Sequence, residues 1–174
     1  VPETNPNLNT ANNWIFGDSV WLKFSDIGIF ENSLPLEILA EASSSYSNSR
    51  GELVLYSRPE TLYDSNGKTV ASLRGGNSSR EGSLILKQRN LDSTFYILSS
   101  DEAEKSSTKY LYLSVFDSLN LDSSLILVKN AVEGLGAVNH LNNQCIWVAS
   151  HDRFSDSFYF FLLKANAALC CPVR

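Results

Sequence analysis

Hydrophobic residues in this 174-residue chain come in bursts of four to eight, and polar residues fill the intervals between them. The bursts are rich in Val, Ile, Leu, Phe, Tyr and Trp and lack helical spacing, which favours strands. The intervals are rich in Ser, Asn and Asp, which are typical of turns and hairpin loops. Only residues 36–42 have a pattern that a short loop helix could use. The sequence therefore predicts an all-β fold.

Three of the bursts share one motif, an apolar, aromatic-rich strand that ends abruptly in serine and another polar residue. They occupy residues 53–59, 95–101 and 146–152. Their starts are 42 and 51 residues apart. Repeats of about 40–50 residues with several short strands each are typical of β-propeller blades. We therefore expect these segments to be the second strands of successive blades.

The remaining bursts divide the chain into an initial segment, residues 13–24, and three four-stranded units, residues 42–72, 83–130 and 136–174. The initial segment has strands at 13–16 and 20–24. The strands expected in the three units are 42–48, 53–57, 61–64 and 68–72; then 83–87, 94–98, 110–116 and 125–129; then 136–141, 145–150, 157–163 and 168–173. The last unit contains a strand that is apolar throughout, residues 158–163, which indicates coverage on both faces.

Three blades are too few to close a ring, since propellers typically have at least four. We therefore expect a partial β-propeller, the N-terminal part of a larger one, in which residues 13–24 close the ring. Residues 1–12 form a polar segment that fits a mature N-terminus left by signal-peptide removal. The alternative is a β-sandwich that is complete in itself.

Composition weighs against several functions. The net charge is −5 and the basic residues are scattered, which argues against a nucleic-acid surface. No apolar run approaches the roughly 18 residues of a membrane span. The cysteines, Cys145, Cys170 and Cys171, have no metal-ligand spacing, and we expect no cofactor. Cys145 is expected to be a small buried residue, and a bond to Cys170 or Cys171 is the alternative in an oxidising compartment.

Two histidines, His140 and His151, are candidates for a hydrolase or metal site, and Asp152 could orient an imidazole. Ser150, His151 and Asp152 are contiguous, and neighbours on a strand point to opposite faces, so they cannot form a triad as they stand. We favour a structural role for these side chains as hydrogen-bond partners of turn backbones.

Three carboxylates, Asp101, Asp152 and Asp156, could ligate calcium, but the alternation of a calcium loop is absent. We favour solvated loop carboxylates. The polar stretch 101–109 is expected to be an exposed loop.

The aromatic side chains could form a sugar-stacking platform. Aromatic residues in blade strands are more often packed between blades, so we assign structural roles to Trp14, Tyr56, Tyr96 and Trp147. The function expected from these residues is non-enzymatic.

The segments that carry a family resemblance are, in order, Trp14–Gly17 and Phe24; Ser45–Ser57; Leu62–Asp64 and Gly67–Val70; Gly76–Ser79 and Ser83–Lys87; Thr94–Leu98 and Asp101; Tyr112–Asp117; and Ala137–His140 with Trp147–His151. In this order they resemble the N-terminal propeller-like region of large Bacteroidetes surface proteins that the type IX secretion system exports. Those proteins often carry a gliding-motility-associated C-terminal sorting domain. The match runs from residue 14 to residue 163 and departs at residues 58–60, where the family usually has an Asp-Gly turn.

The resemblance implies a secreted, outer-membrane-associated module for adhesion or protein interaction on the cell surface. Its partners are then a protein or glycan and the type IX secretion machinery, with no nucleic acid and no membrane span. The shared motifs are scaffold motifs and imply no catalytic residue. The alternatives are a glycan-active hydrolase or lyase with catalytic residues outside this segment, and a structural subunit of a surface filament or assembly.

Bacteria with this exporter are associated with O-glycosylation at Asp-Ser or Asp-Thr followed by an apolar residue or Thr. The resemblance therefore makes Ser19, Ser93 and Ser118 candidate sites, with Ser157 as a looser match. Ser93 is the first choice because residues 89–93 fit an exposed hairpin loop.

Overall fold

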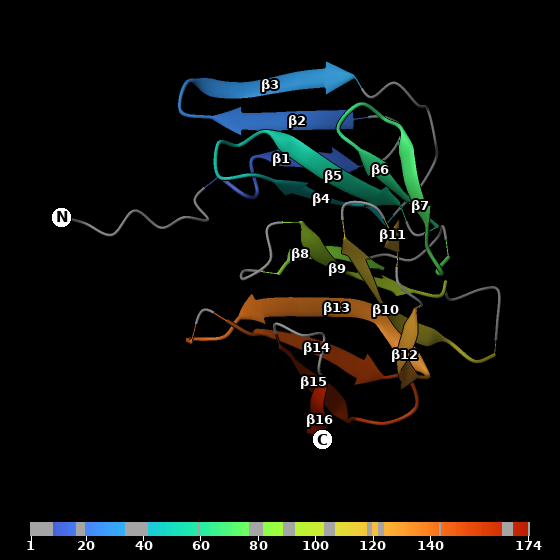
Figure 1. Ribbon diagram of the computed structural model, residues 1–174. Coiled ribbons are helices and arrows are strands. Elements are labelled where there is room, and N and C mark those ends of the chain that lie inside the picture. The colour runs from blue at the N-terminus through green and yellow to red at the C-terminus, as the bar shows by residue number, and fades with distance from the viewer. Residues whose placement is uncertain are drawn as a thin grey trace.

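The computed structural model of the protein consists of strands joined by turns and loops (Figure 1). It describes residues 9–16, 20–33, 42–58, 60–76, 82–88, 93–102, 107–117, 120–121, 124–142 and 144–164, and the backbone of 169–173. The strands are β1 (Asn13–Phe16), β2 (Val20–Ser25), β3 (Gly28–Ser33), β4 (Ser44–Ser47), β5 (Leu53–Arg58), β6 (Thr61–Asp64), β7 (Thr69–Ser72), β8 (Ser83–Lys87), β9 (Thr94–Ser100), β10 (Tyr110–Asp117), β11 (Asn120–Leu121), β12 (Leu125–Lys129), β13 (Ala131–Asn139), β14 (Ile146–Asp152), β15 (Phe158–Leu163) and β16 (Leu169–Val173). The all-β prediction is confirmed, and the described part of the chain has no helix that could cross a membrane.

The described strands form four antiparallel sheets, each built from strands that follow one another in the chain. The first sheet is β1-β2-β3, the second is β4-β5-β6-β7 and the fourth is β13-β14-β15-β16. In the third sheet, β8, β9 and β10 are neighbours, and β11 and β12 both pair with β10. Short connections between consecutive strands produce this antiparallel order.

The three repeated segments are β5, β9 and β14, each the second strand of a different sheet, as the repeat predicted. The sequence analysis missed β3 and β11, and β13 begins at Ala131 rather than at residue 136. The suggested loop helix at 36–42 lies outside the described residues except for Ala42, which is not helical.

The four sheets stack face to face in chain order (Figure 1). Ile15 of the first sheet packs with Tyr56 of the second, and Leu55 of the second packs with Ile97 of the third. Tyr96 of the third sheet packs with Val148 of the fourth. We call the face toward the next sheet in the chain the downstream face, and the opposite one the upstream face.

Strand β9 shows why an internal strand is apolar throughout. Its upstream residues Phe95 and Ile97 pack on the second sheet, and its downstream residues Tyr96 and Leu98 pack on the fourth. Alternate side chains point to opposite faces, so both sets are buried. The sequence of β9 therefore reflects two interfaces at once.

Strand β15 was expected to be covered on both faces, and in the described structure it is covered on one. Phe161 and Leu163 are buried against the third sheet. Phe158 and Phe160 point the other way and expose 52% and 42% of their surface. The difference arises because β15 belongs to the last described sheet of the stack, whose downstream face has no described neighbour.

A bulge in β5 sets the direction of its side chains. Tyr46 pairs with Leu55 and Ser47 with Leu53, so Val54 is the extra residue. Val54 consequently packs on the downstream side with Leu55, while Leu53 packs upstream. The repeat-equivalent residue Tyr96 is also downstream.

The serine-rich segment before Tyr46 holds neighbouring sheets together through hydroxyl groups. The Oγ of Ser44 lies 2.7 Å from that of Ser57 and 3.2 Å from that of Ser83, and the Ser57 and Ser83 hydroxyls are 2.5 Å apart. On the other side, Ser45 donates to the carbonyl oxygen of Asn13. These bonds fix β4 between β1 and β8.

Tyr96 is expected to carry much of the packing between the third and fourth sheets. It is 1% exposed, and its hydroxyl donates to the carbonyl oxygen of Lys164 over 2.6 Å. Tyr96→Ala should lower the free energy of unfolding by about 3–5 kcal/mol, and Tyr96→Phe by about 1 kcal/mol through loss of the hydrogen bond.

The matched control is Trp14→Ala, because Trp14 is 53% exposed. Its cost should be clearly smaller than that of Tyr96→Ala, since the removed surface is largely hydrated already. Urea denaturation followed by circular dichroism measures all three variants. Equal losses for Trp14→Ala and Tyr96→Ala would contradict this assignment of the core.

Candidate functional site

A contact between a tyrosine and an aspartate recurs in the third and fourth sheets. The hydroxyl of Tyr112 on β10 donates to Oδ2 of Asp101 over 3.2 Å. The hydroxyl of Tyr159 on β15 donates to Oδ2 of Asp152 over 2.9 Å. Each pair joins the end of the second strand to the third strand of the same sheet. We call them the two Tyr–Asp braces.

The two braces occupy equivalent positions in their sheets. The backbone N–H of Asp101 donates to the carbonyl oxygen of Tyr110 over 3.0 Å, and that of Asp152 donates to the carbonyl oxygen of Ser157 over 2.9 Å. In each case the acceptor lies two residues before the tyrosine of the brace. The corresponding residue of the second sheet is Pro59, which has no backbone N–H and so cannot make this bond.

Hydrogen bonding and burial act on the titratable groups of the braces. The backbone N–H of Phe154, 2.8 Å from Oδ1, holds the pKa of Asp152 below its ordinary value, and the hydroxyl of Tyr159 adds to this effect. Burial, followed by the charge of Asp101, raises the pKa of Tyr112 to about 12. Tyr112 therefore keeps its proton at neutral pH and acts as a hydrogen-bond donor.

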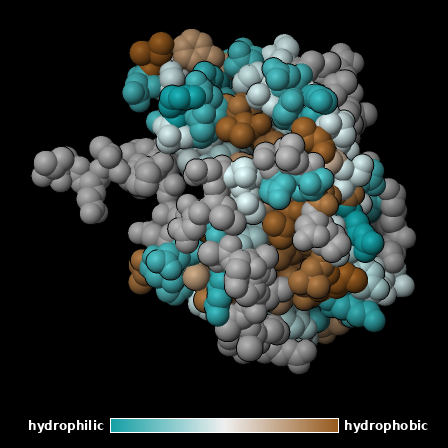
Figure 2. Space-filling model, in the orientation of Figure 1, coloured by the Kyte–Doolittle hydropathy of each residue, from teal (hydrophilic) through white to brown (hydrophobic). Residues whose placement is uncertain are grey.

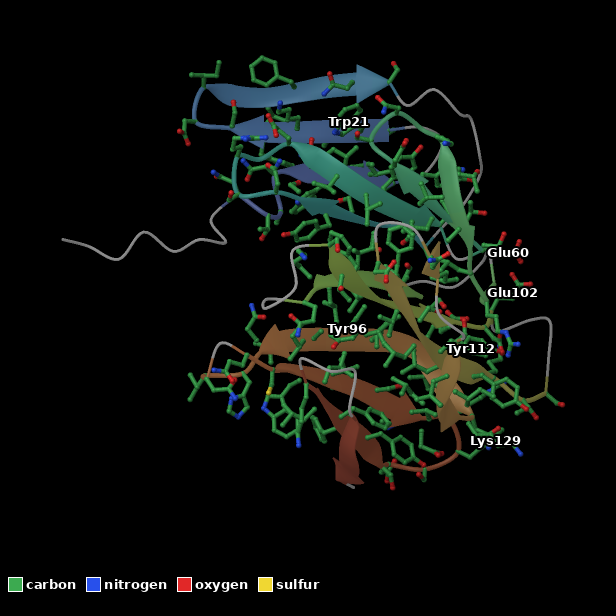
Figure 3. All side chains as sticks on the ribbon, viewed as in Figure 1. Trp21, Glu60, Tyr96, Glu102, Tyr112 and Lys129 are labelled. Atoms are coloured by element: carbon green, nitrogen blue, oxygen red, sulfur yellow. The ribbon has the colours of Figure 1, made fainter. Side chains whose placement is uncertain are left out.

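The environment of Tyr112 extends to the neighbouring sheet. The guanidinium carbon of Arg74, which follows β7, lies 5.8 Å from the centre of the Tyr112 ring. The third sheet also buries charged residues in the stretch expected to be an exposed loop: Glu102 and Lys109 are 5% and 2% exposed. The Lys109 ammonium donates to the carbonyl oxygen of Glu102. Figure 3 shows Glu102 and Tyr112 at the same end of the third sheet.

The expectation of an exposed loop is therefore wrong for Glu102 and Lys109, while Ser107 is exposed as expected. Charged composition suggested exposure, but the aliphatic part of a lysine can be buried when its ammonium group finds a backbone acceptor. The sequence carries no pattern that indicates such a local partner.

His140 and His151 lie at opposite ends of the fourth sheet. Nδ1 of His140 accepts a hydrogen bond from the backbone of Asn142 over 3.0 Å. The His151 ring packs edge-on against Phe158, with 4.6 Å between ring centres. The length of β14 separates the two histidines, and at about 3.3 Å per residue this is on the order of 15 Å. They cannot bind one metal ion or one small substrate together.

Side chains alternate between the two faces along β14, and this separates Ser150 from His151. Ser150 is buried on the upstream face, and His151 lies on the downstream face beside Phe158. Asp156 is exposed in the turn before β15. No three His, Cys, Asp or Glu side chains gather into a metal site within the described residues.

The modification candidates differ in accessibility. Ser93 is exposed in the turn before β9, and Ser157 is half-buried. Ser19 and Ser118 lie outside the described residues. Cys145 is half-buried and its thiol is free, rather than fully buried as expected. The side chains of the other two cysteines lie outside the described part.

The first strands of the last three sheets border a cavity of about 200 Å³. Its lining residues are Thr10, Ser45, Tyr46, Ile85, Leu86, Lys87, Asn139 and Ile146. The ammonium of Lys87 donates to the carbonyl oxygen of Thr94 over 3.3 Å and lies 4.7 Å from the ring centre of Phe95. This cation is therefore engaged by the third sheet, and the lining offers no carboxylate, imidazole or thiol.

Hydrophobic side chains also reach the surface at both ends of the stack. They lie beside β2 and β3 in the first sheet (Figure 2) and on the downstream face of the fourth. Trp147 is half-buried there, with its ring centre 6.0 Å from that of His140. Searches of protein-family models, curated proteins and solved structures find no match to the chain.

The fourth-sheet brace makes a testable prediction about titration. Tyr159→Phe removes a hydrogen bond to the ionised carboxylate, so the pKa of Asp152 should rise toward its ordinary value. Carbon-detected NMR titration of the side-chain carboxyl measures the change. Tyr112→Phe is the matched control, because it removes the same group from the other brace and should leave Asp152 unaffected. An unchanged Asp152 pKa in Tyr159→Phe would contradict the role of the brace.

Proposed function

We propose that the chain is a partial β-propeller that acts as a non-catalytic interaction module on the outer surface of a bacterial cell. The observation that carries this proposal is the serial stack. Consecutive sheets of the same antiparallel order each pack a downstream face on the upstream face of the next. Blades of a propeller are related in this way.

Equivalent side chains support the assignment of the sheets as blades. Val54, Tyr96 and Trp147, the three residues aligned by the sequence repeat, all belong to downstream faces. The two Tyr–Asp braces add a second feature that recurs at equivalent positions. Past the bulge in β5 this match of faces ends, since Leu55 points downstream and its aligned residue Ile97 points upstream. Recurrence of a side-chain environment at aligned positions is typical of repeated architectures.

The use of the candidate chemical groups favours binding over catalysis. The carboxylates of Asp101 and Asp152 accept hydrogen bonds from backbone N–H groups and tyrosine hydroxyls. His140 accepts one from the backbone N–H of Asn142 in its own hairpin turn. A general base and a nucleophile need to lie within hydrogen-bond reach of each other, and these groups serve different turns. Such modules present their loops to a protein or glycan partner.

The location and the exporter are proposed from the order of motifs described above, which resembles that of type IX-exported surface proteins. In the native host, proteinase K added to intact cells should degrade the protein, while a periplasmic marker stays intact. Deleting the region that encodes residues 13–164 should reduce the attachment of cells to glass. Protection from the protease in intact cells would overturn the surface location.

A non-catalytic role also predicts the outcome of an activity assay. The purified native protein should release no fluorophore from a panel of 4-methylumbelliferyl glycosides. Turnover that disappears in His151→Ala, with the circular dichroism spectrum unchanged, would overturn the proposal and favour a glycan-active enzyme. Loss of stability without such turnover fits the structural role of His151 against Phe158.

We further propose that Ser93 carries an O-linked glycan, because it is exposed and follows Asp92 in the motif described above. Peptide mass spectrometry of protein from its own host should show added sugar mass on this serine, and Ser93→Ala should abolish it. Ser49 is the control, since it is also exposed but follows Asn48. An unmodified Ser93 peptide in native material would contradict this prediction.

A further inference from the structure

The downstream face of the fourth sheet is apolar and has no described neighbour. Val138, Phe158 and Phe160 expose 64%, 52% and 42% of their surface. Cross-strand pairing places them on one face with Trp147, since Trp147 pairs with Val138 and Leu162, and Phe160 pairs with Ala149. Apolar side chains grouped in this way on one face mark an interaction surface.

This face repeats the interface that the third sheet makes with the fourth. Tyr96 pairs with Leu86 on the first strand of its sheet, just as Trp147 pairs with Val138. On the third strand of each sheet the pairing is again equivalent. Leu113 pairs with Leu98, two residues after Tyr96, and Phe160 pairs with Ala149, two residues after Trp147. The positions whose side chains pack the third sheet against the fourth thus have apolar equivalents in the fourth sheet, and there these side chains are exposed. The equivalent residues are Leu86 and Val138, Leu111 and Phe158, and Leu113 and Phe160.

The upstream face of the first sheet is the other open end of the stack. Trp14, Phe16 and Ile29 expose 53%, 40% and 65% of their surface. Trp14 pairs with Leu22, and Phe24 pairs with Ile29, so these side chains share the face that points away from the second sheet. The Trp14 and Phe24 rings pack together with 5.0 Å between their centres.

Three interfaces between the described sheets join a downstream face to an upstream face, and one face of each kind has no described neighbour. We propose that the downstream face of the fourth sheet binds the upstream face of the first sheet of a second copy of this chain. The inference rests on the stacked sheets of the proposed function and adds a partner to them. The contact is head to tail, so repetition gives either a closed ring or an open fibre.

The expected contact is small. Four strands spaced about 4.8 Å apart, over about five residues of about 3.3 Å each, define a face roughly 20 Å by 17 Å. A face of this size is below that of a standard stable interface, so association should be weak and concentration-dependent. Sedimentation velocity of the chain between about 5 and 300 μM should show growth from monomer to larger species.

Two lysine substitutions test the two faces separately. Ile29→Lys places a charge on the upstream face of the first sheet, and Val138→Lys on the downstream face of the fourth. Each variant alone should stay monomeric, because each lacks one of the two required faces. An equimolar mixture should form a dimer and nothing larger, since one intact face of each kind remains.

Matched controls lie in the adjoining hairpin turns. Ile27 and Leu141 are 87% and 98% exposed and lie outside the strands that form the two faces. Ile27→Lys and Leu141→Lys add the same charge, and both should associate like the parent chain. Circular dichroism of every variant verifies that the fold is retained.

Several results would overturn the inference. Self-association that persists in Ile29→Lys but is lost in Val138→Lys would indicate pairing of two fourth sheets. A parent chain that stays monomeric at the highest concentration, or aggregates that every variant forms alike, would also exclude the head-to-tail contact.

Native protein also tests which partner covers the downstream face of the fourth sheet. If native protein from the host is monomeric and Val138→Lys lowers its melting temperature without changing its mass, another sheet of the same molecule covers the face and a second copy does not. The proposed surface function is judged independently by proteinase K accessibility and attachment, so a monomeric protein on the cell surface would remove only the inference of self-association.

Discussion

The burial of two apolar faces on each internal sheet is the constraint on which the rest of the structure depends. A single antiparallel sheet of four short strands cannot cover its own faces, so it is stable only when neighbours cover them. In the second and third sheets this requirement is met on both sides by sheets that precede and follow them in the chain. The stacking order therefore follows directly from the order of strands.

Hydrogen bonds between buried polar side chains add to the apolar packing at the interfaces between sheets. Buried polar groups cost free energy unless they find hydrogen-bond partners. Ser57 and Ser83 satisfy this requirement across two sheets, and Asn13 does so by donating to Ser47 and Gly51 over 2.9 Å each. Such bonds are directional, so they select one alignment of sheets that apolar contact alone would leave free to slide.

The sequence predicted most strands because apolar bursts separated by Ser, Asn and Asp are a strong local signal. It missed β3 because residues 28–33 mix apolar, acidic and amide side chains. It also placed Lys109 in an exposed loop, since nothing in the sequence indicates the carbonyl group that its ammonium reaches. Which face of a strand is covered depends on neighbours distant in the chain, and for that reason the exposure of Phe158 and Phe160 could not be foreseen.

The meander order of each sheet has a consequence for synthesis on the ribosome. Every sheet consists of consecutive residues, so it can form soon after its last strand emerges, without waiting for distant parts of the chain. Each newly completed sheet then leaves its downstream face uncovered until the next one is made. During that interval the nascent chain displays an apolar surface, and the translation time of about 40–50 residues sets how long a chaperone has to shield it.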